Sequence, residues 1–549
     1  MFIKLLNNKI GIILFAIVLL AGVLRFWDLG KVPLSLNWDE AAWGYNAYSL
    51  GISGKDEFGM LLPYKYLESY GDYKPPVYAY LDIIPVKLFG LNEFSTRFPS
   101  AFFGTLTVLL TFFLVKRIFK NSQKKDLIAI FSAFFLAISP WHINLSRAAF
   151  EANVASFFVV LGLWAFLAGV SEKRRYLFIS AGSFALTFYI FNTERVVVPI
   201  LVFILAIIFR KELLVRKKET LVAILIGLAI FLPISLFLLS PQANTRFKEV
   251  NIFSDIGVIK NANQEIANDN NSLASKIIHN RRLLFGVDYL QHYFDNFNPN
   301  FLFINGDMNL RFSTKDIGQL LIWDLPFLVL GTFLLFRKRD KNWWIVPVWL
   351  LIGIIPAATA RETPHALRIE VILPTYQILT ALGFVYVLDY LNGKKQAVRK
   401  TIIVILFLVL AMNMFYYLYG YYSNYPRESA NDWQYGYKDS VTYVKKVQNN
   451  YNQIFITSAL GRPYIYYLFY MKIDPSYFRK TADIKRDVFG FVDIKSFGKY
   501  SFNDNIDALN RNGKKTLYIN TIKNTPPDAK IIQTFYLPDG SAYLAAYTK

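Results

Sequence analysis

The segment Asn37–Gly51 reads NWDEAAWGYNAYSLG and opens with two adjacent carboxylates, Asp39 and Glu40. The run before it, Ile10–Trp27, is apolar and long enough to cross a bilayer. An acidic pair directly after a membrane span lies at the lipid–water boundary, which indicates something handled at the membrane surface. The alternative is that the two acids only favour the positive end of a helix.

The composition is that of a polytopic membrane protein. Of the 549 residues, 54% are hydrophobic and 17% aromatic, and the mean hydropathy is +0.30. The formal net charge is +21, but much of the Lys and Arg lies in short loops between apolar runs, so it indicates membrane orientation rather than nucleic-acid binding. Cysteine is absent, which excludes disulfides, thiolate metal sites and cysteine nucleophiles.

Every second loop is basic and is assigned to the inner side, which predicts about eleven transmembrane helices with the N-terminus in the cytoplasm. No signal-peptide cleavage pattern follows the first apolar run, so we expect it to stay as a span. The region 176–209 is about twice the length that one span needs, by the ~20-residue rule, so we expect a hairpin that turns outside at Asn192–Arg195. The helix Val77–Gly90 is too short to span and is expected at the membrane interface. The predicted spans are Ile10–Trp27, Arg97–Val115, Leu127–Leu145, Phe150–Val170, two within Tyr176–Phe209, Leu221–Leu239, Ile317–Phe336, Trp343–Ala360, Ile369–Leu391 and Thr401–Tyr419.

We therefore predict a membrane domain, residues 1–420, and a small extracytoplasmic α/β domain, residues 421–549. Two outer loops belong to the first: residues 28–98, with the acidic motif, and residues 240–316, which are polar and rich in Asn and Asp. The C-terminal pattern predicts two helices and several strands. The helices are near Asp439–Asn449 and Tyr464–Met471, the strands are Gln453–Thr457, near Val488–Val492 and near Thr516–Ile519, and a hairpin turns around Pro538–Gly540.

Acids and bases occur together at the outer ends of the predicted spans. Arg147 and Glu151 are four residues apart, so we expect them to share one helix face. Similar mixtures are Glu194 with Arg195, and Arg361, Glu362, His365, Arg368 and Glu370. Ionisable groups at that depth usually face a cavity and a partner. The alternative is mutual pairing that only fastens helices together.

Sugar transfer from a lipid-linked donor is one chemistry that uses carboxylates beside cations at an outer membrane face. A polyprenyl phosphate is a good leaving group that needs charge stabilisation, and the acceptor hydroxyl needs a carboxylate base. One base and one displacement would invert the anomeric centre. No GxSxG, HExxH or P-loop motif is present, and four scattered histidines argue against a His-rich metal site.

Several motifs resemble the GT-C glycosyltransferases of the protein-O-mannosyltransferase and aminoarabinose-transferase type. The resemblance covers about residues 10–400, and the position of the first motif after the first span is its most specific part. The motifs are WDEAAWGYNAYSL (38–50), GDYKPPVYAYL (71–81), GLNEFSTRFPSAFFGTLTVLLTFFL (90–114), SPWHINLSRAAFEAN (139–153) and ETPHALRIEVILPTY (362–376).

This resemblance implies a multi-pass protein of the cell membrane, a polyprenyl-phosphate sugar donor and an extracytoplasmic active site. Asp39 is the implied base or catalytic carboxylate, with Glu40 beside it. The motif at 139–153 resembles the second outer loop of the family, and Glu151 matches the acidic position of that loop, where many relatives have Asp. Arg195 and Arg368 resemble positions used for the donor phosphate.

The remaining candidate ligands come from the charges of the outer face. We expect Lys74 to act as a third, mobile cation and Arg147 and His365 to assist in substrate binding. Asp39, Glu40 and Glu151 could hold a hard divalent cation through oxygen ligands, but carboxylates alone do not show one.

Two other classes of membrane protein fit the sequence less well. A transporter or flippase for a lipid-linked or anionic solute would need charges near the bilayer midplane and commonly inverted repeats, whereas these charges lie at one face. A non-catalytic scaffold that displays the C-terminal domain would leave the outer carboxylates and cations unexplained. The sequence does not name the sugar or the protein, lipid or glycan acceptor.

Overall fold

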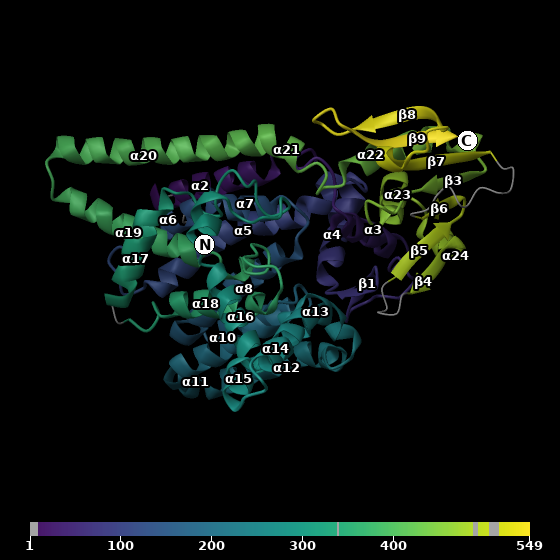
Figure 1. The fold of residues 1–549 in the computed structure, drawn as a ribbon. Coiled ribbons are helices and arrows are strands. Elements are labelled where there is room, and N and C mark those ends of the chain that lie inside the picture. Colours follow the sequence, from purple (N-terminus) through teal and green to yellow (C-terminus); the bar gives the residue numbers. More distant parts are fainter. Residues whose placement is uncertain (1–8, 338–339, 487–491, 504–514, 549) are drawn as a thin grey trace. The chain divides into compact units, whose positions relative to one another are not determined.

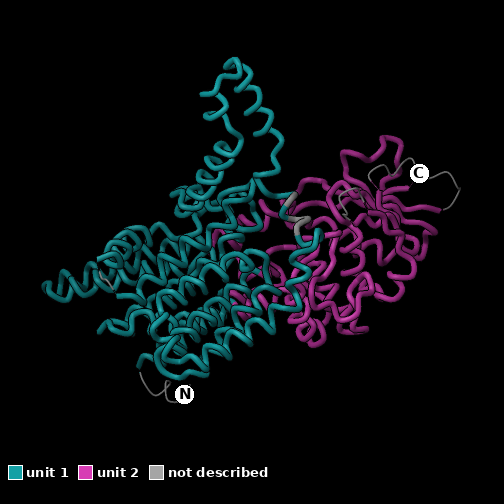
Figure 2. Tube along the Cα trace, turned by 90° about the horizontal axis from the view of Figure 1, so that it is seen from below, with its two compact units in different colours: residues 1–24, 104–144, 152–417 teal, residues 25–103, 145–151, 418–549 magenta. Residues whose placement is uncertain are grey.

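The computed structural model describes residues 9–337, 340–486, 492–503 and 515–548 (Figure 1). The chain forms two compact units, which Figure 2 colours separately. Unit 1 comprises residues 1–24, 104–144 and 152–417, and unit 2 comprises residues 25–103, 145–151 and 418–549. Residues 28–98, the predicted first outer loop, and the C-terminal domain, which the sequence analysis assigned to separate domains, therefore belong to one unit.

Unit 1 is helical, as predicted. Six helices of the described residues are long and apolar enough to cross a membrane: Lys9–Phe26, Glu93–Ile118, Glu151–Ser171, Lys217–Leu238, Glu370–Asn392 and Gln396–Glu428. A seventh span is formed if α6 (Lys125–Ala137) and α7 (Pro140–Ser146), which meet at a bend of 56°, are counted together. Shorter helices occupy the other predicted spans: α9 (Tyr176–Thr187), α10 (Glu194–Ile208), α17 (Asp324–Arg337) and α18 (Ile345–Ile354). The number of eleven spans stays a prediction.

Helix α9 ends at Thr187 and α10 begins at Glu194, so the helical structure is interrupted where the charged turn was predicted. Elsewhere small residues allow helices to approach closely. A Cβ added at Gly331 of α17 or at Gly383 of α19 (Thr375–Asn392) would overlap with the backbone of the opposite helix. Packing of this kind is typical of helices within a membrane.

The polar segment 240–316, predicted as a loop, is largely helical. It contains α13 (Thr245–Val250), α14 (Ile256–Asn268), α15 (Leu273–Ile278) and α16 (Arg281–Asp295). Three of these helices begin after a side chain that accepts a backbone N–H: Asp255, Ser272 and Asn280. The abundant Asp and Asn that suggested a loop are in part helix caps.

Unit 2 begins with α3 (Trp38–Ser53), the antiparallel hairpin β1 (Leu67–Ser69) and β2 (Asp72–Lys74), and α4 (Val77–Phe89). Its C-terminal part is a seven-stranded mixed sheet in the order β4-β5-β6-β3-β7-β9-β8. The central β3 is parallel to both neighbours, and the other pairs are antiparallel. The strands are β3 (Gln453–Ile456), β4 (Asp483–Arg486), β5 (Val492–Phe497), β6 (Tyr500–Phe502), β7 (Thr516–Thr521), β8 (Lys530–Tyr536) and β9 (Ala542–Thr548), and the helices are α21 (Tyr425–Glu428), α22 (Tyr435–Val447), α23 (Pro463–Met471) and α24 (Pro475–Thr481).

These elements confirm the predicted α/β character of the C-terminal region. Both predicted helices, the strand at Gln453 and the terminal hairpin are present. The strand predicted near Val488–Val492 lies mostly outside the described residues, and β5 begins at Val492.

One core joins the first loop to this domain. Residues of α3, among them Tyr45, pack with Tyr464 and Phe478 and with the inward face of the sheet, which includes Ile454 and Ile519. Burial of this shared apolar surface stabilises the position of α3.

Candidate functional site

The site is built around the start of α3. Asn37 caps this helix: its side-chain oxygen accepts the backbone N–H groups of Asp39 at 2.8 Å and Glu40 at 3.0 Å. Glu40 returns the contact and accepts the N–H of Asn37 at 3.1 Å, so the two residues form a capping box. Both acids therefore lie in the first turn, where the helix dipole favours negative charge.

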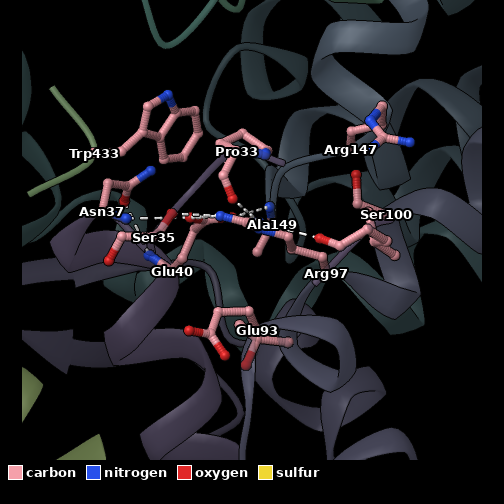
Figure 3. Close-up of polar contacts among 12 residues, drawn as sticks. Pro33, Ser35, Asn37, Glu40, Glu93, Arg97, Ser100, Arg147, Ala149 and Trp433 are labelled. Carbon is pink, nitrogen blue, oxygen red and sulfur yellow. Dashed lines mark hydrogen bonds and ion pairs between the residues drawn. The ribbon is translucent and has the colours of Figure 1, made fainter. Parts of the chain in front are cut away.

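Glu40 is fully buried and connects three segments of unit 2 (Figure 3). Its carboxylate pairs with Arg97, whose Nε lies 2.9 Å from Oε1 and whose Nη2 lies 3.2 Å from Oε2. The same Oε1 accepts the backbone N–H of Ala149 at 2.8 Å. The Arg97 guanidinium also donates to the carbonyl oxygens of Leu29, Pro33 and Ser35. The Glu40 carboxylate therefore connects α3 to Arg97 and to the backbone at Ala149.

Asp39 has a different environment from its neighbour. Its side chain is 42% exposed, and its Oδ1 is ion-paired with the Lys74 ammonium. Lys74 ends the β1–β2 hairpin, and its side chain is only 10% exposed. The Lys74 Nζ lies 5.3 Å from the centre of the Trp43 ring and 5.5 Å from that of Tyr70. Lys74 is therefore a fixed cation held between two rings and Asp39, not the mobile one that we expected.

Glu151 is half-buried and begins α8 (Glu151–Ser171). Its carboxylate interacts electrostatically with Lys74 and with Asp39. The structure therefore brings together Asp39, Lys74 and Glu151, three residues that the sequence analysis selected from three separate motifs.

Arg147 does not share a helix face with Glu151, because α7 ends at Ser146 and the chain turns before α8 begins. Its buried guanidinium donates to the Tyr421 hydroxyl at 3.0 Å and to the Val32 carbonyl at 3.0 Å, and it lies over the Tyr421 and Tyr422 rings. The four-residue spacing of Arg147 and Glu151 led to a wrong prediction because the helix is interrupted between them. These contacts give Arg147 a role in fixing the segment between α7 and α8.

Arg195, His365 and Arg368 belong to unit 1. Arg195 Nε donates to the Phe188 carbonyl at 3.1 Å, across the break between α9 and α10. Arg368 donates to the Glu362 carbonyl at 3.2 Å. Burial lowers the pKa of the His365 imidazole well below its ordinary value, and the positive charge of Arg368 lowers it further. His365 and Arg368 are thus brought together, and nearby Asp307 accepts the Ala366 N–H at 2.7 Å.

The three carboxylates named as candidate metal ligands do not form a ligand set. In the part of the chain that the structure describes, no group of three or more His, Asp or Glu side chains is placed to hold a metal ion. Both oxygens of Glu40 are engaged with Arg97 and with backbone N–H groups.

Sequence reasoning missed two parts of this site. Arg97 lies in a quoted motif but was given no role, and its position early in a predicted span was the available signal. The aromatic residues Trp43 and Tyr70, which enclose Lys74, gave no pattern that distinguishes them from ordinary core residues.

Comparison with known proteins finds similar sequences for parts of the chain. Residues 73–237 match the family model described as dolichyl-phosphate-mannose-protein mannosyltransferase. A segment of 105 residues, 19% of the chain, is 30% identical to an uncharacterized protein of Aquifex aeolicus and spans 20% of that relative's length.

Solved structures share the fold. ArnT from Cupriavidus metallidurans superposes with a TM-score of 0.54 at 13% identity over 97% of each chain, and its complex with undecaprenyl phosphate does so with 0.53 at 12% over 98% of each. The oligosaccharyltransferase AglB from Archaeoglobus fulgidus, in complex with an inhibitory peptide and a dolichol-phosphate, gives 0.52 at 14% over 85% of this chain and 64% of its own. The family model thus supports the resemblance to the protein-O-mannosyltransferase type over residues 73–237, and the solved structures show a fold shared with ArnT.

Proposed function

We propose that this chain is an integral membrane glycosyltransferase that moves a sugar from a polyprenyl-phosphate donor to an acceptor hydroxyl on the extracytoplasmic face. The observation that carries the proposal is the Asp39–Lys74 pair. A half-exposed carboxylate is held at the start of a helix, against a buried cation and beside a second carboxylate, Glu151. Binding of undecaprenyl phosphate by ArnT, which shares the fold, supports the choice of donor.

In the proposed reaction Asp39 takes the proton of the acceptor hydroxyl as that oxygen attacks the anomeric carbon. The bond from that carbon to the phosphate oxygen breaks, and the lipid phosphate leaves with the electron pair. A single displacement of this kind inverts the anomeric centre. The fixed ammonium of Lys74 orients Asp39 and offers positive charge where the phosphate departs.

Glu40 acts as a positioning residue, since its carboxylate is buried and bonded to Arg97 and Ala149. Glu151 contributes negative charge beside Lys74. Arg195 and Arg368 are proposed donor-phosphate ligands on the basis of the family resemblance. A guanidinium suits a phosphate because several N–H donors lie in one fixed plane.

The proposal is tested by mass spectrometry of glycans and glycolipids from cells with and without the chain. We expect one or more species that carry an added sugar only when the chain is present. Purified chain supplied with a polyprenyl-phosphate sugar and with the acceptor identified in this way should then release free polyprenyl phosphate. An unchanged glycan profile combined with movement of intact lipid-linked sugar between leaflets would favour the flippase alternative.

A further inference from the structure

Arg462 lies in the C-terminal part of unit 2, directly before α23. Its backbone is left-handed, with φ 41° and ψ 50°. A residue with a side chain pays an energetic cost in this region, and such residues persist where the surroundings fix them, often at ligand sites.

The guanidinium of Arg462 reaches the aromatic enclosure of the candidate site. It lies 4.1 Å from the centre of the Tyr70 ring, the same ring that Lys74 contacts at 5.5 Å. Tyr70 is buried, and its hydroxyl donates to the Trp38 carbonyl at 2.6 Å. The neighbouring Gly461 lies against the Trp38 ring. Tyr70 therefore links Arg462 to the start of α3 and to the Asp39–Lys74 pair.

Arg462 lacks the ion pair that two other arginines of the unit form. Arg97 is paired with Glu40, and Arg486 with Glu68. Within the described ranges Arg462 has no ion pair and no hydrogen bond, and its side chain is only half-buried. Contact with a ring uses the face of a guanidinium and leaves the N–H groups along its edge free to donate. Because Asp39 is ion-paired with Lys74, Arg462 adds a further positive charge near the pair.

We propose that Arg462 binds a phosphate group of the substrate next to Asp39 and Lys74, so that the C-terminal domain contributes a ligand to the site. This inference rests on the proposed function. The phosphate belongs either to the polyprenyl-phosphate donor or to a phosphorylated acceptor, and in both cases a fixed planar donor set recognises it.

Binding measurements on the purified full-length chain test this inference without any need for turnover. The probes are undecaprenyl phosphate, for the donor, and inorganic phosphate, for a phosphorylated acceptor. We expect Arg462→Gln to weaken binding of at least one probe about 10- to 100-fold, the range for loss of a charged hydrogen bond. Arg486→Gln, which removes an exposed arginine of the same unit, should leave both affinities unchanged.

The two sources and the alternative give different results. Weaker binding of undecaprenyl phosphate assigns Arg462 to the donor, and weaker binding of inorganic phosphate alone assigns it to the acceptor. Unchanged affinity for both probes overturns the inference and leaves Arg462 a packing partner of Tyr70. A transfer assay that fails while Arg462→Gln still weakens binding would refute the proposed function but not the phosphate site.

Two further variants separate binding from folding. Arg462→Lys keeps the charge but loses the planar donor set, so it should restore part of the affinity. Arg462→Gly removes the side chain, and glycine adopts the left-handed conformation without the energetic cost that other residues pay. The melting temperature of this variant should therefore stay close to that of the wild type. Loss of binding in this glycine variant then reports the missing guanidinium rather than unfolding.

Discussion

Asp39 and Glu40 are adjacent and chemically similar, yet the fold gives them opposite environments. The Asp39 side chain is 42% exposed and is ion-paired with Lys74, whereas the Glu40 side chain is fully buried against Arg97. The first arrangement suits a residue that exchanges a proton with substrate, and the second suits a residue that holds the site together.

Asp39→Asn should reduce transfer by a factor of about 10² to 10⁴, the usual contribution of a general base, because an amide cannot accept the acceptor proton. Expression and membrane insertion should persist, since the side chain is partly exposed. Release of polyprenyl phosphate by the purified variant is the measurement. Asp28→Asn is the matched control, because Asp28 is an exposed acid of the same loop that pairs with Lys31. Substantial turnover by a folded Asp39→Asn variant would remove Asp39 from this role.

Glu40→Gln should act mainly on stability. The substitution leaves the buried Arg97 without a counter-charge, and breaking a buried pair costs roughly 3–5 kcal/mol. Thermal melting in detergent measures the loss. Glu68→Gln, which removes the acid of the Arg486 pair nearer the surface, should cost about 0–1 kcal/mol. Equal melting temperatures for the two variants would show that the Glu40–Arg97 pair does not stabilise the unit.

Glu57 makes the stability of unit 2 depend on pH. Its side chain is buried and accepts the Ser69 hydroxyl at 3.0 Å, and burial raises its pKa from 4.5 to about 8. Between these values the unfolded chain has lost the proton that the folded chain keeps. The free energy of unfolding therefore falls as pH rises from about 4.5 to 8, by up to about 1.4 kcal/mol per pH unit.

Glu57→Gln should remove this part of the pH dependence, so that the variant gains stability over the wild type as pH is raised from 5 to 8. Melting temperatures at pH 5, 6, 7 and 8 check the slope. The wild type, measured at the same four pH values, is the reference. A Glu57→Gln curve parallel to the wild type would mean that Glu57 is ionised in the folded protein.

At the scale of elements, α3 is positioned by close packing at one glycine. A Cβ added at Gly44 would overlap with the Thr96 hydroxyl and with the Phe469 ring of α23. Gly44→Ala should therefore destabilise unit 2 by about 1–3 kcal/mol and lower transfer by displacing Asp39. Thermal melting and the transfer assay measure both effects.

Gly51 of the same helix provides the matched comparison. A Cβ there would meet the flexible end of Lys87 at 3.2 Å, so Gly51→Ala should be neutral or stabilise the helix by up to about 1 kcal/mol. If both alanine variants behave alike, the contact at Gly44 does not position α3.

The elements that periodicity predicted well are those with a local signal. The helices near 439 and 464, the strand at 453 and the hairpin near 538–540 all follow from residue spacing and turn residues. The helices within 240–316 were missed because their caps, Asp255, Ser272 and Asn280, were counted as loop residues. The helix shared by Arg147 and Glu151 was wrongly expected because local spacing cannot show where tertiary packing interrupts a helix.

In the candidate site, too, residues with a local sequence signal could be predicted, whereas roles that depend on distant partners could not. Asp39 and Glu40 could be found because two acids after a span are rare, and Lys74 and Glu151 because they lie in motifs that resemble a family. Their separate roles could not, since they depend on partners far away in sequence: Arg97 for Glu40 and the Trp43 and Tyr70 rings for Lys74. Arg462 carried no motif at all, and only the folded chain brings it to Tyr70.

At the scale of the whole molecule, unit 2 gathers segments from three distant parts of the sequence, residues 25–103, 145–151 and 418–549. If these segments form one functional unit, they must lie on one side of the membrane. The alternation of basic loops independently predicts that side to be the outer one, because loops rich in Lys and Arg favour the cytoplasm. Within the loop 116–125, Lys116, Arg117, Lys120, Lys124 and Lys125 give the strongest such signal.

Cysteine labelling can test this topology cleanly, because the chain has no cysteine of its own. Gln123→Cys places a thiol in the basic loop, and Ser541→Cys places one in the turn between β8 and β9; both positions are exposed. In intact cells a membrane-impermeant maleimide should label residue 541 and spare residue 123, and permeabilised cells should show both labelled, which controls for reactivity. The reverse pattern would place Asp39 and the sheet in the cytoplasm and overturn transfer at the outer face. Labelling of both residues in intact cells would mean that an odd number of spans does not separate the basic loop from the C-terminal domain.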